Sequence, residues 1–419
     1  MSKYHSLRGM PDIPPEEARL FRWVEDRARE VFGLFEFSEI RTPLLEETEV
    51  FKRSIGEDTD IVGKEMYSFP DRGGKDISLR PEGTASVVRA YIEHGWHTGP
   101  DILKLFYMGP MFRGERPQKG RLRQFHQIGA EIMGSSGPYL DAELILSLVS
   151  VLESLKVKGY EISLNSLGCV SDRVSYRTAL KDFLLEEKAD LCDDCGRRVE
   201  TNVLRVLDCK RAGCGSVLKN APRIADYLCA RCAKEHNDLV SILGGMQVDF
   251  SRNDYMVRGL DYYTGTVFEV VHPALGAQNA VAAGGRYDDL TKQMGGPDVG
   301  AAGYSIGVER ILLAVGKEAV PCVRPGVLIV AVDDLSRDEA FRLTNGFRAE
   351  GISCDMDHSG RSLKGGLRRA NKEKRRNVIL LGEDEVKKGR ILLKDMKSGE
   401  QRSLSFEEAV RALKEVEEI

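Results

Sequence analysis

Three short segments of the chain concentrate arginine, glutamate, glutamine and tyrosine where strands would otherwise be apolar. The first is Arg80-Pro81-Glu82-Gly83-Thr84, where a strand is predicted to end and a helix to begin. The Glu82 carboxylate and the Thr84 hydroxyl could hold a substrate ammonium group at this junction. They could equally be the polar residues that helix N-termini favour. The residues alone leave both interpretations open.

The second segment runs from Phe112 to Glu131 and is predicted to form two strands joined by a glycine-containing hairpin. It carries five cations and one acid over eleven residues: Arg113, Arg116, Lys119, Arg121 and Arg123, with Glu115. Arginine makes bidentate contacts with phosphate oxygens, so this density of cations favours a polyphosphate or an RNA end as ligand. A solvated hairpin tip is the alternative interpretation.

The returning strand of this hairpin places Phe125, Gln127, Gly129 and Glu131 on one face, because side chains alternate with a period of two. Two polar residues would therefore lie on the surface that the aromatic ring covers. A face of this composition is not expected to be simple core.

The third segment is RGLDYYTG at 258–265, followed by GGRYDDL from Gly284 and by AAGYSIGVERILL at 301–313. The glycines allow the backbone to approach a ligand closely. Arg310 falls in the first turns of a predicted helix, where the helix dipole opposes a cation. A bound anion would offset that repulsion.

The elements around these segments predict a mixed α/β fold. Helices are predicted at 15–32, 46–54, 83–93, 141–156 and 308–315, and β-like runs at 66–71, 77–81, 103–114, 124–134, 246–250 and 265–272. This order favours an α+β core with an antiparallel sheet over regular βαβ repetition. The core is predicted to be split by an inserted subdomain, because residues 158–244 carry helical charged segments and seven of the nine cysteines.

A second, smaller α/β domain is predicted after a short linker at Arg324–Gly326. VLIVAVD, a helix over 338–350, ISCDMD, a basic helix over 362–373 and NVILLG alternate as strand, helix, strand, helix, strand, which predicts a largely parallel sheet. Within it, residues 361–376 hold eight cations and one acid. A phosphate-contacting surface, with Arg368 and Arg369 as the test residues, and a merely solvated helix are the two interpretations of this basic segment.

Composition excludes several classes of protein. With 419 residues, 42% hydrophobic and 30% charged, the chain is globular rather than disordered, and its net charge of −4 gives no overall excess of positive charge for nucleic acid. No apolar run approaches the roughly 20 residues that cross a bilayer. The first residues, MSKYHSLRGMPD, lack an export signal, so we expect a cytoplasmic protein without a membrane partner.

Six cysteines come in pairs within the insertion: Cys192 and Cys195, Cys209 and Cys214, Cys229 and Cys232. The two CxxC pairs, Cys192/Cys195 and Cys229/Cys232, could close a structural Zn²⁺ site with four thiolates, and Cys209 and Cys214 could replace either pair. Reduced thiols in a small subdomain are the alternative.

These segments together resemble the histidyl-tRNA synthetases of bacterial type, a family of class II aminoacyl-tRNA synthetases, over essentially the whole chain. FSEIRTPLLE at 37–46 is similar to the first class II motif, which forms the dimer interface, FRGERPQKGRLRQFHQIGAE at 112–131 to the second, and GYSIGVERIL at 303–312 to the third. RGLDYYTG and AAGGRYDDL resemble segments characteristic of the histidine enzyme in particular. The resemblance implies a catalytic core at 1–157 and 245–320, the cysteine-bearing insertion at 158–244, and an anticodon-binding domain at 325–419. Because the basic segment falls in this last domain, we prefer its phosphate-contacting role.

The resemblance also implies an activity and its partners. ATP and Mg²⁺ would activate histidine as an adenylate, releasing diphosphate, and the histidyl group would pass to tRNA(His) with release of AMP, in a homodimer. The alternative is a catalytically silent paralogue that senses histidine as a regulatory subunit of ATP phosphoribosyltransferase. Such paralogues lack the terminal domain and catalytic residues, whereas this chain has Arg113, Arg258, Arg310 and a complete terminal domain.

Individual roles follow from the same resemblance. Arg113 and Arg258 would act in catalysis, Arg258 between the histidine carboxylate and the α-phosphate. Other positions would bind substrates: histidine at Glu82, Thr84, Gln127, Glu131, Tyr262 and Tyr263; ATP at Arg113, Phe125 and Arg310, with the adenine between Phe125 and Arg310; and the tRNA acceptor end at Gln118 and Lys119.

Overall fold

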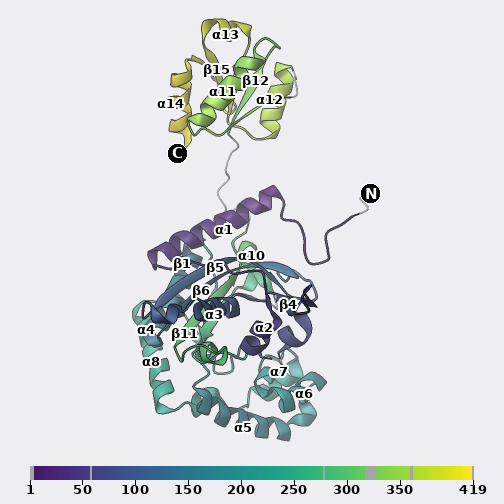
Figure 1. The fold of residues 1–419 in the computed structure, drawn as a ribbon, viewed down its shortest axis with the longest axis vertical. Helices are drawn as coiled ribbons and strands as arrows, with labels where there is room; N and C mark the ends of the chain where they lie inside the picture. Colours follow the sequence, from purple (N-terminus) through teal and green to yellow (C-terminus); the bar gives the residue numbers. More distant parts are fainter. Residues whose placement is uncertain (1–3, 57–58, 277–278, 317–325, 359–361, 418–419) are drawn as a thin grey trace. The chain divides into compact units, whose positions relative to one another are not determined.

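The computed structural model describes residues 4–56, 59–276, 279–316, 326–358 and 362–417 (Figure 1). The chain divides into two compact units, Met1–Val320 and Pro321–Ile419. Most of the linker expected at 324–326, and Arg361 of the basic segment, lie outside the described residues.

An eight-stranded sheet forms the centre of the first unit. Its order is β1 (Ser38–Glu39), β5 (Leu103–Phe112), β6 (Gln124–Met133), β11 (Ala301–Gly307), β10 (Ala280–Arg286), β9 (Thr264–Val271), β7 (Glu161–Ser166) and β8 (Ser251–Arg252). Every pairing is antiparallel except β1 with β5 and β7 with β8. The expected antiparallel core is confirmed.

Helices cover the two faces of this sheet because its side chains alternate. Phe106 of β5 joins a core with α1 (Pro15–Leu34), α4 (Pro138–Ser154), α8 (Ala230–Gly245) and α10 (Val308–Val315). Its neighbours Leu105 and Tyr107 point the other way, into a second core shared with α3 (Thr84–Glu93). Short elements complete this side: α2 (Thr48–Ile55), η1 (Ile61–Glu65), η2 (Trp96–Thr98) and α9 (Leu290–Gln293). A further short element, η6 (Pro273–Leu275), packs with α10 against the first core.

A small three-stranded sheet is built from β2 (Leu45–Glu47), β4 (Asp76–Leu79) and β3 (Ser68–Pro70), all antiparallel. On one face, the buried Ser78 hydroxyl contacts those of Thr48 and Ser68. The opposite face carries Leu45 and Phe69, both more than 40% exposed.

The insertion is shorter than the expected 158–244. Strand β7 belongs to the central sheet, and α8 packs on α4, with Leu239 and Leu243 in the main core. The segment that leaves the core comprises α5 (Val170–Glu186), η3 (Lys188–Asp190), α6 (Asp193–Thr201), η4 (Val203–Val206), α7 (Ala212–Leu218) and η5 (Ile224–Tyr227). Figure 1 shows α5, α6 and α7 gathered at the end of this unit farthest from α1.

One expected strand is also wrong. Residues 246–250 follow the end of α8 as turn and coil, and only Ser251–Arg252 pair with the sheet. The apolar residues there, Val248 and Phe250, pack against the main core from a loop instead.

The second unit contains a five-stranded sheet in the order β13 (Cys354–Met356), β12 (Val327–Ala331), β14 (Asn377–Leu381), β15 (Ile391–Asp395), β16 (Gln401–Leu404). Its helices are α11 (Arg337–Ala349), α12 (Leu363–Lys372), α13 (Glu383–Lys388) and α14 (Phe406–Glu417). The sheet is mixed rather than largely parallel, because β15 and β16 pair antiparallel after β14. Neither ILLKD of β15 nor QRSL of β16 alternates apolar and polar residues, so the pattern does not predict a strand at either place.

Candidate active site

A cavity of about 650 Å³ opens in the first unit. It is lined by the connection between β5 and β6, by the start of β6, and by strands β9 to β11. The segments that the sequence singled out converge on it. Nine of the predicted site residues line its walls: Glu82, Thr84, Arg113, Phe125, Gln127, Arg258, Tyr262, Tyr263 and Arg310. The tenth, Glu131, is hydrogen-bonded to Thr84 of the cavity wall.

Glu131 is a fully buried acid held by hydroxyl groups. Thr84 Oγ1 donates to Glu131 Oε1 at 2.8 Å, and the Tyr287 hydroxyl donates to Oε2. Burial away from water raises the pKa of Glu131 to about 8, although these hydrogen bonds pull in the other direction. An acid of this kind can exchange hydrogen bonds with a ring nitrogen that enters the cavity.

Glu82 fits both roles considered for the first segment, because it caps a helix and also lines the cavity. Its carboxylate accepts from the backbone N–H groups of Thr84 (2.7 Å) and Ala85 (2.9 Å), so it caps the start of α3. It also lines the cavity, where burial raises its pKa. One carboxylate therefore fixes the helix and presents negative charge to a ligand.

Tyrosine rings close the floor of the cavity. Tyr262 stands edge-on to Tyr287 with ring centroids 5.6 Å apart and lies 4.7 Å from the centroid of Tyr263. Tyr107 belongs to the same core and packs between Gly83 and Gly129. A Cβ atom at either glycine would collide with the Tyr107 ring. These glycines let an aromatic ring fit flat against the backbone.

Arg113 and Phe125 form one edge of the cavity. The Arg113 guanidinium lies 5.2 Å from the Phe125 ring centroid, and its Nε donates to the Pro81 carbonyl at 2.9 Å. Arg310 lies in the first turn of α10 and donates to the carbonyls of Gly120 (3.0 Å) and Ala280 (2.6 Å). Arg113 thus covers one face of Phe125, and the adenine expected between Phe125 and Arg310 stays a prediction.

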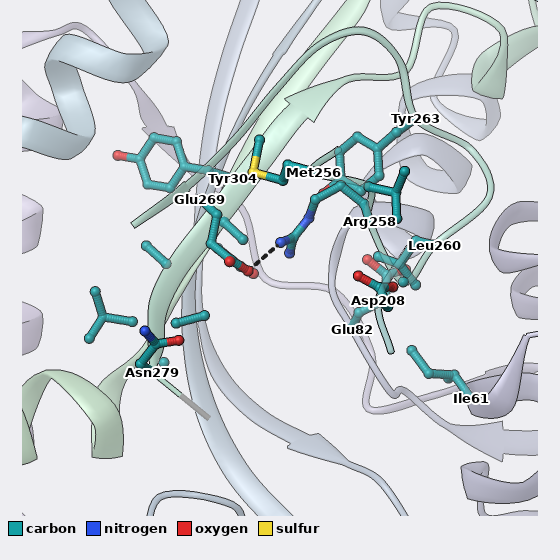
Figure 2. Close-up of a pocket in the computed structure, with 18 of the residues that line it drawn as sticks. Ile61, Glu82, Asp208, Met256, Arg258, Leu260, Tyr263, Glu269, Asn279 and Tyr304 are labelled. Atoms are coloured by element: carbon teal, nitrogen blue, oxygen red, sulfur yellow. Dashed lines mark hydrogen bonds and ion pairs between the residues drawn. The ribbon is translucent and has the colours of Figure 1, made fainter. Parts of the chain in front are cut away.

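Arg258 reaches across the cavity toward Glu269 of β9 (Figure 2). Its Nη1 donates to Glu269 Oε1 at 2.6 Å, while its buried Nε has no hydrogen-bond partner among the described residues. Gln127 is similar: its Nε2 donates to Ser305 at 3.3 Å, and its buried Oε1 lacks a partner within the same residues. Both groups are positioned to meet polar atoms of a ligand.

The charges of the cavity are of both signs, with a cationic side and a carboxylate and hydroxyl side. Such a site suits a ligand pair in which one member is polyanionic and the other is a zwitterion. This is the arrangement that ATP and an amino acid require.

Comparison with known proteins agrees with this geometry. A family model described as "Histidyl-tRNA synthetase" matches residues 9–311, and one described as "Anticodon binding domain" matches residues 326–416. The chain belongs to the histidyl-tRNA synthetase family. The fold class, with an α+β catalytic core and an anticodon-binding domain, is confirmed.

Individual relatives cover nearly the whole chain. The chain is 47% identical over 405 residues to the histidine--tRNA ligase of Nitratidesulfovibrio vulgaris strain DP4, covering 96% of this chain and 97% of that protein. It is 49% identical over 395 residues to the ligase of Geobacter metallireducens, covering 94% and 95%. Among solved structures, the apo histidyl-tRNA synthetase of S. aureus superposes with a TM-score of 0.82 at 32% identity, covering 98% of this chain and 100% of that one.

Several residues of this synthetase site were not singled out from the sequence. Tyr287, the donor to Glu131, lies in the quoted GGRYDDL run, and its hydroxyl was a detectable signal there. Glu269, the partner of Arg258, sits in an ordinary-looking strand. Arg198 and Arg205 of the insertion also line the cavity, far from any motif.

The expected tRNA residues of the synthetase lie at two places. Gln118 and Lys119 are exposed at the tip of the β5–β6 hairpin, where Gln118 and Arg121 exchange backbone hydrogen bonds. Arg368 is exposed on α12 of the second unit. Arg369, by contrast, is engaged within its own domain by Asp355 (2.5 Å) and Glu373 (2.6 Å).

The cysteines assemble differently from the expected quartet. The two CxxC pairs fall in separate clusters: Cys192 and Cys195 meet Cys209 and Cys214, whereas Cys229 and Cys232 meet Cys169 and Asp172. The site made of Cys192, Cys195, Cys229 and Cys232 is therefore not formed, because each pair starts a different helix, α6 or α8. The alternative that used Cys209 and Cys214 is the one that brings four thiols together.

None of the described helices has the length and apolar content that crossing a membrane requires.

Proposed function

We propose that the chain ligates histidine to tRNA(His), using ATP to form histidyl-adenylate with release of diphosphate and then releasing AMP on transfer. The observation that carries this proposal is the cavity itself, where the cations Arg113, Arg258 and Arg310 face a buried carboxylate and tyrosine pocket. The silent regulatory paralogue is disfavoured because these cations and the terminal unit are present.

The cationic side would carry out activation. A histidine carboxylate oxygen attacks the α-phosphorus of ATP, a new O–P bond forms, and the bond to the β-phosphate oxygen breaks. Negative charge gathers on the phosphoryl oxygens, so fixed positive groups lower the barrier. The Nε of Arg258, which has no hydrogen-bond partner in the described part of the chain, is suited to this position, because Nη1 is already anchored on Glu269.

ATP would enter with Mg²⁺, which offsets part of the triphosphate charge. Arg113 and Arg310 would contact the phosphates from the hairpin and from α10. Phe125 offers an aromatic face for the adenine beside Arg113.

The carboxylate and tyrosine side would select histidine. Glu82 and Thr84 would hold the ammonium group, Gln127 would meet the carboxylate side, and Glu131 with Tyr263 would bond the imidazole nitrogens. A pocket that satisfies both ring nitrogens leaves buried groups unpaired when another side chain enters. A pocket of this kind can favour the correct amino acid over a competitor by a factor of roughly 10⁴ to 10⁵ without an editing step.

The tRNA would contact both units. Gln118 and Lys119 at the hairpin tip are proposed to meet the acceptor end. On α12, Lys364, Arg368 and Lys372 are exposed and share one face at four-residue spacing. We assign the phosphate contacts of the basic segment to this face, with Arg369 supporting it from behind.

The homodimer is proposed on the small three-stranded sheet. Leu45 and Phe69 leave its outer face apolar, and Leu44 beside them is also exposed. An apolar patch on the first motif suits a second copy of the chain. The reaction is proposed to take place in the cytoplasm, where its substrates are.

Pyrophosphate exchange with each of the 20 amino acids, followed by charging of total tRNA, tests the function. We expect exchange with histidine alone and one charged tRNA species. Arg258→Gln should lower exchange by on the order of 10² to 10³, whereas the exposed Arg342→Gln should not change it. Exchange with another amino acid, or none, would contradict the proposal.

A further inference from the structure

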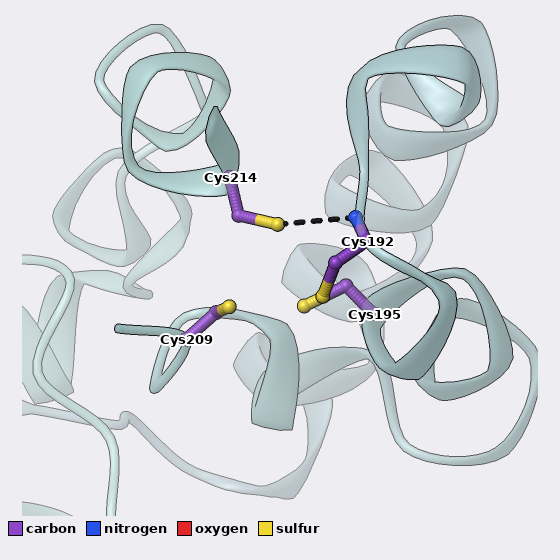
Figure 3. A group of neighbouring side chains, drawn as sticks. All are labelled: Cys192, Cys195, Cys209 and Cys214. Atoms are coloured by element: carbon purple, nitrogen blue, oxygen red, sulfur yellow. Dashed lines mark hydrogen bonds between the residues drawn. The ribbon is translucent and has the colours of Figure 1, made fainter. Parts of the chain in front are cut away.

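Four cysteine thiols converge on one point in the insertion (Figure 3). Cys192 precedes α6 and Cys195 lies in its first turn, Cys209 follows η4, and Cys214 lies in α7. Their sulfur atoms all lie within 4.8 Å of one another. Cys195 and Cys214 are buried, and the other two are half-buried.

These separations fit a single tetrahedral ion. Zinc–thiolate bonds of about 2.3 Å place the sulfurs of a tetrahedral site roughly 3.8 Å apart. An iron–sulfur cubane, which lies between its thiolates, would spread them more widely. Cys192 N–H donates to Cys214 Sγ at 3.3 Å, a contact that stabilises a thiolate ligand.

The cluster closes both ends of a segment that faces the active site. Between Cys195 and Cys209 the chain carries Arg198 and Arg205 into the cavity wall, and Asp208 and Lys210 flank Cys209 there. Arg205 Nη2 and Arg198 Nη2 bind Asp60 at 3.3 and 3.5 Å.

A further bond ties this segment directly to the histidine-specific motif. Asn202 Nδ2 donates to Asp261 of RGLDYYTG at 3.2 Å. The helices on either side, α6 and α7, have nine and seven residues, and helices this short need an external constraint to persist.

We propose that Cys192, Cys195, Cys209 and Cys214 bind one Zn²⁺, and that this ion holds residues 192–214 in place as a wall of the catalytic cavity. Its role is structural, and no step of catalysis passes through the ion. The predicted effect on catalysis rests on the proposed function, whereas zinc binding itself does not.

The second cysteine cluster provides a contrast within the same insertion. Asp172 accepts from the backbone N–H groups of Cys169 and Cys229, both at 3.1 Å, and so joins the starts of α5 and α8 through its own carboxylate. The mixed ligand set and the engaged carboxylate make it the weaker candidate. Cys229→Ser is therefore a matched control for the four-thiol site.

The test measures zinc and iron per chain by mass spectrometry in the full-length protein and its variants. We expect Cys209→Ser to contain one zinc ion fewer than the wild type, with Cys354→Ser, in the second unit, unchanged. Cys229→Ser should keep the ion that Cys209→Ser loses. Equal zinc in the wild type and Cys209→Ser, or iron in its place, would overturn the proposal.

A second measurement covers the case in which Cys209→Ser does not fold. Wild-type protein stripped by a strong chelator and reloaded with Co²⁺ should give the visible absorption of a tetrahedral tetrathiolate site. Absence of that spectrum would reject the site.

The role as a wall is tested by histidine-dependent exchange of the stripped protein. We expect exchange to fall by ~10-fold or more, because small displacements of a cavity wall are costly, and to recover when zinc is returned. Unchanged exchange after full removal would reject the role as a wall. Zinc binding in a protein that exchanges with no amino acid would leave the site standing and reject the proposed function instead.

Discussion

At the scale of single residues, the site depends on carboxyl groups buried next to hydroxyl donors. Thr84 and Tyr287 surround Glu131, and Gly303 makes room for it, because a Cβ there would overlap its Oε2 atom. The period-two pattern of the returning strand predicted that Glu131 shares a face with Gln127 and that this face is not simple core. Its donor Tyr287 comes from far along the chain, and local patterns carry no information on such a pairing.

Glu131→Gln should change how stability depends on pH. The native carboxyl keeps its proton up to about pH 8, whereas in the unfolded chain it loses it near the ordinary value of 4.5. Between these values the native state binds more protons than the unfolded state, so the free energy of unfolding falls as pH rises. The variant lacks this slope, which is at most ~1.4 kcal/mol per pH unit for one proton.

Urea unfolding of both proteins at pH 5.5, 7 and 8.5 measures this difference. The stability of Glu131→Gln relative to the wild type should increase along the series. A constant difference would mean that Glu131 is not a raised-pKa group.

Gly303→Ala should disable the pocket by displacing the Glu131 carboxylate. We expect ~1–3 kcal/mol of destabilisation from overpacking and a loss of histidine-dependent exchange of ~10²-fold. Gly244→Ala in α8 is the control, because no atom lies within 4 Å of its added Cβ. Similar exchange in the two variants would contradict the described packing.

At the scale of elements, α12 shows what a charge pattern can and cannot predict. The basic run predicted a helix close to the observed Leu363–Lys372. It did not distinguish Arg368, which faces solvent, from Arg369, which is held by Asp355 and Glu373. That distinction depends on β13, an element that the sequence pattern does not place next to the helix.

Separate substitutions should therefore have different effects. Arg368→Gln should weaken tRNA binding and reduce its salt dependence by about one charge, without changing stability. Arg369→Gln should cost ~1–2 kcal/mol of stability in the second unit, since its ion pairs are only partly screened. Filter binding at several salt concentrations measures the effect of Arg368→Gln on tRNA binding, and thermal unfolding measures the effect of Arg369→Gln on stability. Histidine-dependent pyrophosphate exchange should be unchanged in both variants.

At the scale of the whole molecule, the small sheet predicts assembly. Phe69→Asp places a charge on the exposed apolar face of β3, which should shift a dimer toward monomers in sedimentation experiments without altering the fold. Glu383→Gln, on α13 of the second unit, is a control that should leave the mass unchanged. A wild-type protein that sediments as a monomer at micromolar concentration would refute the proposed dimer.

The C-terminal unit completes its own core with Ala409, Val410 and Leu413 of α14, packed on its own sheet. The other described members of that core, such as Val327, Phe347 and Ile379, come from the same unit. The part of the chain proposed to read the anticodon can thus be exchanged with that of a relative by a crossover at 317–325. Such a chimera would change which nucleic acid is accepted and leave the choice of amino acid intact.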